Sequence, residues 1–257
     1  VTGTTRRRCS GRAGPSSIRR GGKSLKTKVV MAWGGGKDSA VALCRLQRDP
    51  RFEVVGLLTT LTAGYDRISM HGVRQVLLDA QAEALGLKVY PVWIAPHSSN
   101  EAYEAEMSRA VETLQQAGVK AVGFGDLFLE DVRAYRERML APTGLRPLFP
   151  IWGEDTKNLS RWVIASGFRA TLTCVDPRVL SPDFVGRAYD ETLLAELPPG
   201  IDPCGENGEF HTFVHDAPNF RQAIPTVVGV RVERDGFFFA DLLPAAVEAR
   251  DPASQAS

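Results

Sequence analysis

The chain has 257 residues, of which 44% are hydrophobic, and this is enough for one large domain or two small domains with buried cores. No apolar run approaches the length that a membrane span needs, so we expect no membrane partner. Nine of the 31 basic residues precede Val29 without any acidic residue, which leaves 22 basic against 30 acidic side chains and makes the rest a poor candidate for binding nucleic acid.

Residues 1–27 are rich in Gly, Ser and Arg and lack an apolar period, so we expect them to form a disordered basic tail. The chain has four cysteines, Cys9, Cys44, Cys174 and Cys204, and no two of them form a C-x-x-C motif. Scattered cysteines favour a reducing compartment, which we take to be the cytoplasm, and they argue against a zinc or iron–sulfur site.

A predicted buried strand over residues 29–32 is followed by the sequence WGGGKDS at residues 33–39 and then by a helical pattern. Consecutive glycines let backbone N–H groups turn toward an anion, and the helix start adds the positive end of its dipole. The loop is not a Walker A loop, because Asp38 separates Lys37 from Ser39. The segment predicts a phosphate site, and the alternative is a glycine-rich turn that only packs the helix on a sheet.

Strands and helices alternate through the middle of the chain. The predicted elements are strands over 52–60, 88–93 and 121–124 and helices over 72–85 and 100–116. This order predicts an α/β fold with a doubly wound, Rossmann-like parallel sheet. Because ligands bind at the carboxyl ends of such strands, we expect the phosphate loop and residues 59–71, 96–99 and 125–130 to lie along one edge.

The pattern changes near Arg146, where proline and glycine become frequent and the predicted elements become short. These elements are a helix over 156–166, a strand over 170–175 and a hairpin with strands over 227–233 and 236–242. We therefore expect a nucleotide-binding domain over 28–145, a second, smaller α+β domain over 146–242 and a C-terminal tail over 243–257.

A second group of titratable residues lies in the sequence CGENGEFHTF at residues 204–213. Glu206, Glu209 and His211 form a dense cluster in a loop flanked by glycines. Such a cluster could bind a cationic group, bind a metal or transfer a proton. An acidic surface turn is the alternative.

These segments carry a family resemblance. Residues 33–39 resemble the SGGKDS loop of the N-type ATP pyrophosphatases, which split ATP between its α and β phosphates, with Gly34 in place of the usual Ser. Residues 204–210 resemble the C-G-E-[GN]-G-E-[YF] signature of the diphthine-ammonia ligase family, a branch of that superfamily. Residues 125–137 and 148–152 are similar to that family's G-x-I-x-S-x-Y-Q-R-x-R-x-E and P-L-x-x-L-W segments, the former only in outline. The resemblance covers about residues 29–220.

The resemblance implies a HUP-type ATP-binding pyrophosphatase domain and an amide-forming ligase. A substrate carboxylate would attack the α phosphate of ATP, releasing pyrophosphate, and ammonia would then displace AMP. The implied cofactors are ATP and Mg²⁺, and the implied partners are ATP, ammonia and an unidentified carboxylate acceptor, with a homo-oligomer left open. Two alternatives remain: a sulfur transferase that modifies RNA, and a non-catalytic nucleotide sensor.

The expected site residues fall into three groups. Those expected to bind ATP are Trp33, Gly34, Gly35, Gly36, Lys37, Asp38, Ser39, Thr60, His71 and Gly125. Those expected to act in catalysis are Lys37, Asp38, Glu206, Glu209 and His211, with Asp38 also expected to hold Mg²⁺. Those expected to bind the substrate are Asp126, Glu130, Arg133, Arg136, Glu206 and Glu209. The alternatives are a surface-loop histidine for His71 and a solvated helix face for Glu130, Arg133 and Arg136.

Overall fold

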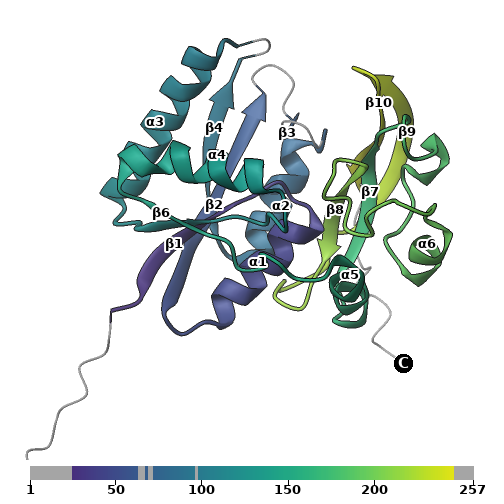
Figure 1. Cartoon of the computed structure of the whole chain (residues 1–257), viewed down its shortest axis with the longest axis horizontal. Helices are drawn as coiled ribbons and strands as arrows, with labels where there is room; N and C mark the ends of the chain where they lie inside the picture. The colour runs from purple at the N-terminus through teal and green to yellow at the C-terminus, as the bar shows by residue number, and fades with distance from the viewer. Residues whose placement is uncertain (1–24, 63–66, 69–71, 96–97, 246–257) are drawn as a thin grey trace, which may run out of the picture.

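The protein is described by a computed structural model, which covers residues 25–62, 67–68, 72–95 and 98–245. It consists of two sheets with their helices, set side by side (Figure 1). We call the parallel sheet and its four helices the first lobe, and the antiparallel sheet with its two helices the second lobe.

The first lobe is built on five parallel strands in the spatial order β4-β2-β1-β5-β6. These strands are β1 (Thr27–Ala32), β2 (Phe52–Thr62), β4 (Lys88–Ile94), β5 (Ala121–Gly123) and β6 (Arg146–Leu148). The short strand β3 (Arg67–Ile68) pairs antiparallel with the end of β2. Val29, Val30 and Met31 of β1 are fully buried, which explains the unbroken apolar run, because the central strand of such a sheet is covered on both faces.

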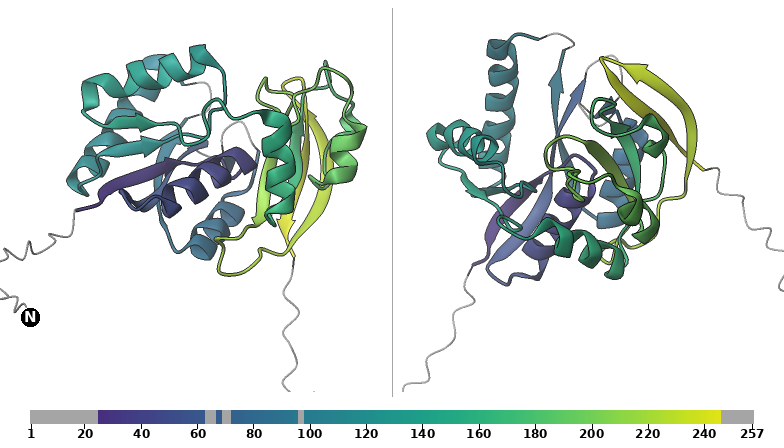
Figure 2. Two further views of the ribbon diagram at one scale, coloured as in Figure 1. Left: turned by 60° about the horizontal axis from the view of Figure 1, so that its bottom comes forward. Right: turned by 45° about the vertical axis from the view of Figure 1, so that its right-hand side comes forward.

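Two pairs of helices cover the two faces of this sheet (Figures 1 and 2). They are α1 (Lys37–Arg48) and α2 (Gln75–Leu85) on one face, and α3 (Asn100–Gln116) and α4 (Glu130–Leu140) on the other. Val29 and Met31 pack in the cluster that contains α1 and α2, and Val30 packs in the cluster that contains residues of α3 and α4. The expected doubly wound sheet is therefore confirmed.

The second lobe is a four-stranded antiparallel sheet in the order β8-β7-β10-β9. Its elements are α5 (Thr156–Ala165), β7 (Arg169–Val175), α6 (Glu191–Glu196), β8 (Phe210–Asp216), β9 (Thr226–Arg234) and β10 (Phe237–Pro244). Two short 3₁₀ turns, η1 (Ala141–Thr143) and η2 (Pro182–Phe184), lie in the connections. The second, smaller α+β unit is confirmed as a fold.

The structure differs from the sequence expectations at several boundaries. Strand β6 pairs with β5, so the first sheet extends to Leu148 and not only to residue 145. Three residues that include Pro147 carry too little pattern to be recognised as a strand. Strand β10 runs to Pro244, two residues past the expected end of the second domain, and α2 begins at Gln75 rather than at residue 72. The expected tails lie largely outside the described residues.

The two lobes share one hydrophobic core. The larger cluster of buried residues includes Val41 and Leu43 of α1 together with Phe213 and Val214 of β8. The Val214 amide also donates to the Gly35 carbonyl at 2.9 Å, which joins β8 to the turn after β1. None of the helices that the structure describes is long and apolar enough to cross a membrane.

Candidate functional site

The glycine turn of residues 33–36 connects the carboxyl end of β1 to the start of α1. Gly35 has a left-handed φ of 78°, and a Cβ atom there would lie 2.9 Å from Gln81 Oε1, so both backbone and space require glycine. Gly36 is the N-cap of α1 and supplies no side-chain cap, while the Ser39 hydroxyl donates to the Gly36 carbonyl at 2.9 Å. The Lys37 amide donates to Thr212 Oγ1 of β8 at 3.1 Å, and the amides that follow it at this helix start are suited to binding an anion.

Gln81 of α2 forms hydrogen bonds to this turn, and it was not among the residues predicted from the sequence. Its side chain is fully buried and accepts a hydrogen bond from Trp33 Nε1 at 2.8 Å. Its Nε2 group donates to the carbonyls of Gly35 and Val214 at 3.0 and 2.7 Å. One amide side chain thus ties the turn to both lobes. The available signal was a polar residue on the apolar face of a predicted helix, where a buried amide needs partners.

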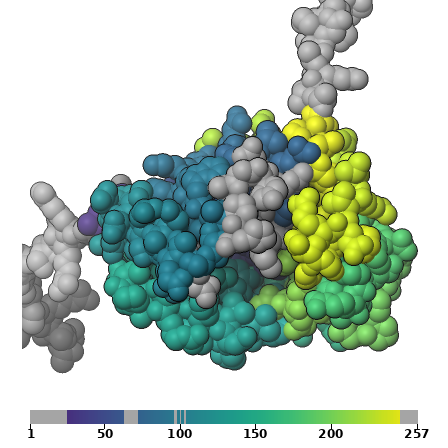
Figure 3. All heavy atoms as spheres, turned by 90° about the horizontal axis from the view of Figure 1, so that it is seen from above, coloured from purple at the N-terminus to yellow at the C-terminus, as the bar shows by residue number. Residues whose placement is uncertain are grey.

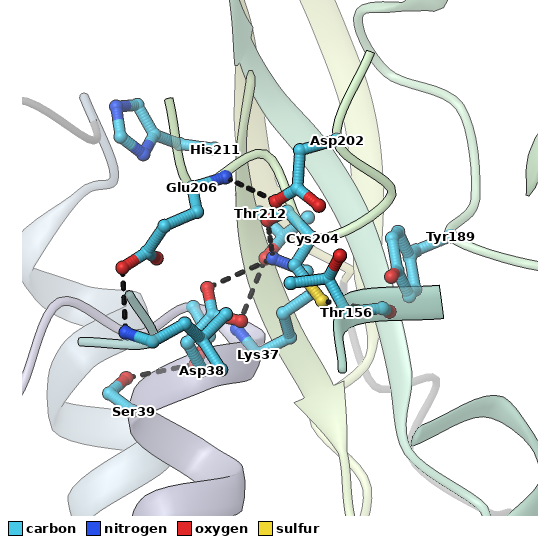
Figure 4. A network of polar contacts seen from close by, with 12 residues as sticks. Lys37, Asp38, Ser39, Thr156, Tyr189, Asp202, Cys204, Glu206, His211 and Thr212 are labelled. Carbon is cyan, nitrogen blue, oxygen red and sulfur yellow. Dashed lines mark hydrogen bonds and ion pairs between the residues drawn. The ribbon is translucent and has the colours of Figure 1, made fainter. Parts of the chain in front are cut away.

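Lys37 and Asp38 begin α1 and form an ion pair with Nζ and Oδ2 2.9 Å apart. The Lys37 side chain is only 2% exposed, and its Nζ group also donates to the carbonyl of Cys204 in the second lobe (Figure 4). Burial alone would lower the pKa of Lys37, but the Asp38 carboxylate, together with the nearby Cys204 and Asp202, outweighs burial, so that the pKa lies above its usual value. The ammonium group is therefore charged and already bonded to two partners.

The loop before β8 contains the two glutamates of the second cluster, and the structure separates them. Glu206 reaches across to the first lobe, where its Oε1 accepts from the Leu127 amide at 2.6 Å. Glu209 is 5% exposed and turns inward, accepting from the amides of Asp202 and Asn207, each at 3.0 Å. Glu206 lines the cavity described below, and Glu209 is not among its lining residues.

Burial changes the protonation of the two titratable groups that this loop brings to the cavity. It raises the pKa of Glu206 to about 7, and the nearby carboxyl groups of Asp38 and Asp126 act in the same direction, against the hydrogen bond from Leu127. Burial also lowers the pKa of His211 to about 4, with help from the charge of Lys37, so this imidazole is neutral at pH 7.

The segment after β5 forms the other wall. A Cβ atom on Gly125 would lie 2.8 Å from the Ser39 amide nitrogen, so this glycine allows β5 to approach the start of α1 closely. Asp126 Oδ2 is buried without a hydrogen-bond partner and lies 3.6 Å from Nε of Arg136, a residue of α4. Arg133 instead pairs with Glu137 and lies over the Trp152 ring, its guanidinium carbon 4.8 Å from the ring centre.

These segments enclose a cavity of about 570 Å³ between the lobes. Figure 3 shows the lobes from above, the first in blue and teal and the second in green and yellow. The expected site residues that line the cavity are Trp33, Gly34, Gly36, Lys37, Asp38, Ser39, Thr60, Gly125, Asp126, Arg136, Glu206 and His211. Gly35, Glu130, Arg133 and Glu209 do not line it, and His71 lies outside the described residues. In the described part of the chain, no group of three His, Cys, Asp or Glu residues could hold a metal ion.

Comparison with known proteins gives a consistent result for both lobes. Residues 27–147 match the diphthamide synthase N-terminal domain and residues 155–239 match the diphthamide synthase C-terminal domain. The chain is similar to the diphthine–ammonia ligase of Danio rerio, with 30% identity in an alignment 219 positions long that covers 77% of this chain and 85% of the relative. It is similar to that of Homo sapiens, with 28% identity in an alignment 225 positions long that covers 77% of this chain and 82% of the relative.

A longer relative shows the same similarity. The diphthine–ammonia ligase of Schizosaccharomyces pombe is 24% identical in an alignment 225 positions long that covers 77% of this chain and 36% of that protein. The two domain matches span both lobes and include the phosphate loop of the first and the Glu206 loop of the second. With a two-domain match and a relative at 30% identity over most of both lengths, the chain belongs to the diphthine–ammonia ligase family.

Proposed function

We propose that this protein is an ATP-dependent ligase that joins ammonia to a carboxylate and releases AMP and pyrophosphate. The ligase class follows from the family to which the chain belongs. One observation supports the two-step reaction most directly: the phosphate loop of the first lobe and Glu206 of the second line the same cavity. At about 570 Å³ this cavity is in the usual range for a small-molecule site.

In the first step, the backbone N–H groups of the turn and the start of α1 would bind the β and γ phosphates. The acceptor carboxylate attacks the α phosphorus, the bond to the bridging oxygen breaks, and pyrophosphate leaves with the bonding electron pair. Arg136 is the guanidinium group that faces the cavity, and it would neutralise the carboxylate or the α phosphate. Its loose 3.6 Å contact with Asp126 leaves it able to take a stronger anionic partner.

Mg²⁺ fits this cavity through the nucleotide rather than through a protein cage. Magnesium at nucleotide sites is held by one or two carboxylates together with phosphate oxygens and water. Asp38 and Asp126 line the cavity, and Asp126 Oδ2 is buried without a hydrogen-bond partner, so these two residues would hold the ion. When bound, Mg²⁺ supplies positive charge that stabilises the leaving pyrophosphate.

In the second step, Glu206 would take the proton that ammonium must lose before it can attack. With a pKa of about 7, its carboxyl group is ionised in half of the molecules at neutral pH, which suits a general base. The ammonia nitrogen then forms a bond to the acyl carbon, and the carbon–oxygen bond to AMP breaks. The neutral imidazole of His211, which lies at the start of β8 directly after this loop, would hydrogen-bond the reacting groups without adding charge.

The acceptor is a carboxylate, and diphthine is the candidate that the names of the relatives supply. We place the protein in the cytoplasm, because Cys44, Cys174 and Cys204 are free thiols in the described part of the chain. These thiols also argue against the sulfur-transferase alternative. All three are buried, and burial raises the pKa of Cys204 to about 12, so the thiol beside the cavity is not a nucleophilic thiolate at neutral pH.

The test is to incubate the protein with MgATP, ¹⁵N-ammonium and elongation factor 2 that carries diphthine. We expect AMP, pyrophosphate and one ¹⁵N atom incorporated per acceptor. Formation of ADP and phosphate, or binding of ATP without turnover by any acceptor carboxylate, would contradict the proposed reaction. Formation of AMP without amide would show that the carboxylate is activated but that another nucleophile is used.

A further inference from the structure

The position of the Lys37 side chain does not match the role expected for it. Lys37 belongs to the phosphate loop, but its ammonium group lies over two neighbouring aromatic rings of the second lobe, 5.6 Å from the centre of Tyr189 and 5.4 Å from that of Phe210. It bonds to the carbonyl of Cys204 and to Asp38. Two of its three N–H donors are therefore used within the protein, and the side chain is only 2% exposed.

The bond to Cys204 is one of several anchors of the loop that carries Glu206. Tyr189 Oη donates to the Pro203 carbonyl at 2.7 Å, which ties the loop to its own lobe. Lys37 Nζ bonds the next carbonyl and ties the loop to the start of α1. Two residues later, Glu206 accepts from Leu127 and ties the loop to the segment after β5. Figure 4 shows Lys37 between α1 and this loop.

We propose that Lys37 is a positioning residue, which holds residues 202–206 against the phosphate loop and thereby places the Glu206 carboxyl group in the cavity. The phosphates are then bound by the backbone of the turn and the helix start, and not by Lys37. The catalytic part of this proposal rests on the proposed function, and the structural part does not.

A first experiment measures the structural part on the whole unliganded chain. Lys37→Met keeps the length of the side chain and removes its charge and hydrogen bonds. The Leu127 amide donates its hydrogen bond to Glu206. We expect the hydrogen of this amide to exchange with deuterium at least about tenfold faster in this variant. Lys28→Met is the matched control, because Lys28 is an exposed lysine of β1 whose ammonium group donates to the Ala117 carbonyl, at 3.4 Å, and not to the loop that carries Glu206. In the control, exchange at Leu127 should not change.

A folding failure would not end this test. If Lys37→Met leaves Asp38 as an uncompensated buried charge and the chain does not fold, the double variant Lys37→Met/Asp38→Asn removes both charges of the pair and carries the same measurement. Unchanged exchange at Leu127 in a folded variant would overturn the positioning role.

A second experiment separates positioning from phosphate binding. In a plot of the rate of amide formation against pH, the acidic limb of the wild type should have its midpoint near pH 7, where Glu206 ionises. Lys37 is not among the main causes of that pKa, so in Lys37→Met a released, hydrated Glu206 should shift the limb down by about one unit or more, toward its usual value. The dissociation constant for MgATP, measured by calorimetry, should change by less than about threefold.

The opposite result identifies a phosphate contact. MgATP binding weaker by about a hundredfold, with an unmoved acidic limb and unchanged Leu127 exchange, would overturn the proposal. Failure of the wild-type protein to form any amide would contradict the proposed function instead, because the exchange measurement needs no reaction.

Discussion

Glu206 and Glu209 are three residues apart in one loop and have opposite surroundings. Glu209 is closed in by the amides of its own loop, whereas Glu206 crosses to the first lobe and faces the cavity. We infer that Glu209 shapes the loop and that Glu206 takes part in the reaction. Their chemical identity makes them a matched pair for mutation.

Glu206→Gln should lower the rate of amide formation by about a hundredfold or more, because an amide cannot accept the proton of ammonium. Affinity for MgATP, measured by calorimetry, should stay within about threefold, since Glu206 is outside the phosphate loop. Glu209→Gln is the control and should retain amide formation in the folded protein, at a cost of about 1 kcal/mol in stability for the weakened loop. Equal losses of rate in the two variants would show that the assignment to Glu206 is wrong.

The raised pKa of Glu206 also predicts how stability depends on pH. The carboxyl group ionises near pH 4.5 in the unfolded chain and near 7 in the folded chain, so between these values the folded state holds more protons. Raising the pH through this window therefore lowers the contribution of Glu206 to stability. The melting temperatures of Glu206→Gln and the wild type can be compared at pH 4 and at pH 8. The melting temperature of the variant minus that of the wild type should be larger at pH 8 than at pH 4. A difference between the two proteins that does not change with pH would contradict the pKa shift.

Gly34 and Gly35 are adjacent and should respond differently to serine. Gly34 is not among the described glycines with a left-handed φ, and Gly34→Ser restores the hydroxyl usual in N-type ATP pyrophosphatases. We expect MgATP binding to tighten by about 0.5–1.5 kcal/mol for one added hydrogen bond. Gly35→Ser should destabilise the fold, because its φ is 78° and its Cβ would lie 2.9 Å from Gln81 Oε1. Calorimetric titration and thermal melts measure both, and weaker nucleotide binding by Gly34→Ser would refute the first expectation.

At the scale of elements, α2 not only covers one face of the parallel sheet but also supports the phosphate loop through Gln81. Gln81→Leu would remove the hydrogen bonds of Trp33 Nε1 and of the Gly35 and Val214 carbonyls to this side chain, and of these groups the Gly35 carbonyl keeps its bond from the Val214 amide. We expect a loss of about 3 kcal/mol in the free energy of unfolding, because unsatisfied buried polar groups cost about 1–3 kcal/mol each and leucine repays part by its own burial.

The control for this element is Gln47→Leu on α1, whose amide accepts a hydrogen bond from Asn219 at an exposed position. Its cost, measured in the same urea titrations, should be below about 1 kcal/mol. If the two variants lose the same stability, the network under the phosphate loop is not a major support.

At the scale of the molecule, the lobes should unfold together. The larger cluster of buried residues spans both lobes, and Arg74 at the start of α2 binds Asp241 of β10 through two hydrogen bonds of 2.9 and 2.6 Å. Scanning calorimetry should therefore show a single transition, with equal calorimetric and van't Hoff enthalpies. Two separated transitions would show that the lobes are independent folding units.

The sequence by itself determined the elements and the family. The apolar run of β1, the glycine turn and the length of α3 depend on residues close together in the chain, and α3 spans the expected residues 100–116. The motif order likewise identified both lobes before any contact was known. Short elements such as β6 were missed, because three residues carry no readable period.

Only the tertiary structure decided what the site residues do. Lys37 and the Cys204 carbonyl are 167 positions apart, and the loop that holds the phosphates rests on Gln81, 46 positions beyond Gly35. Two glutamates that are equivalent in the motif are separated into one that faces the cavity and one that braces its own loop. The reason is physical: local patterns report which surfaces a segment must bury, whereas the partner of each polar group, and hence its charge and task, is set by which distant segment packs against it.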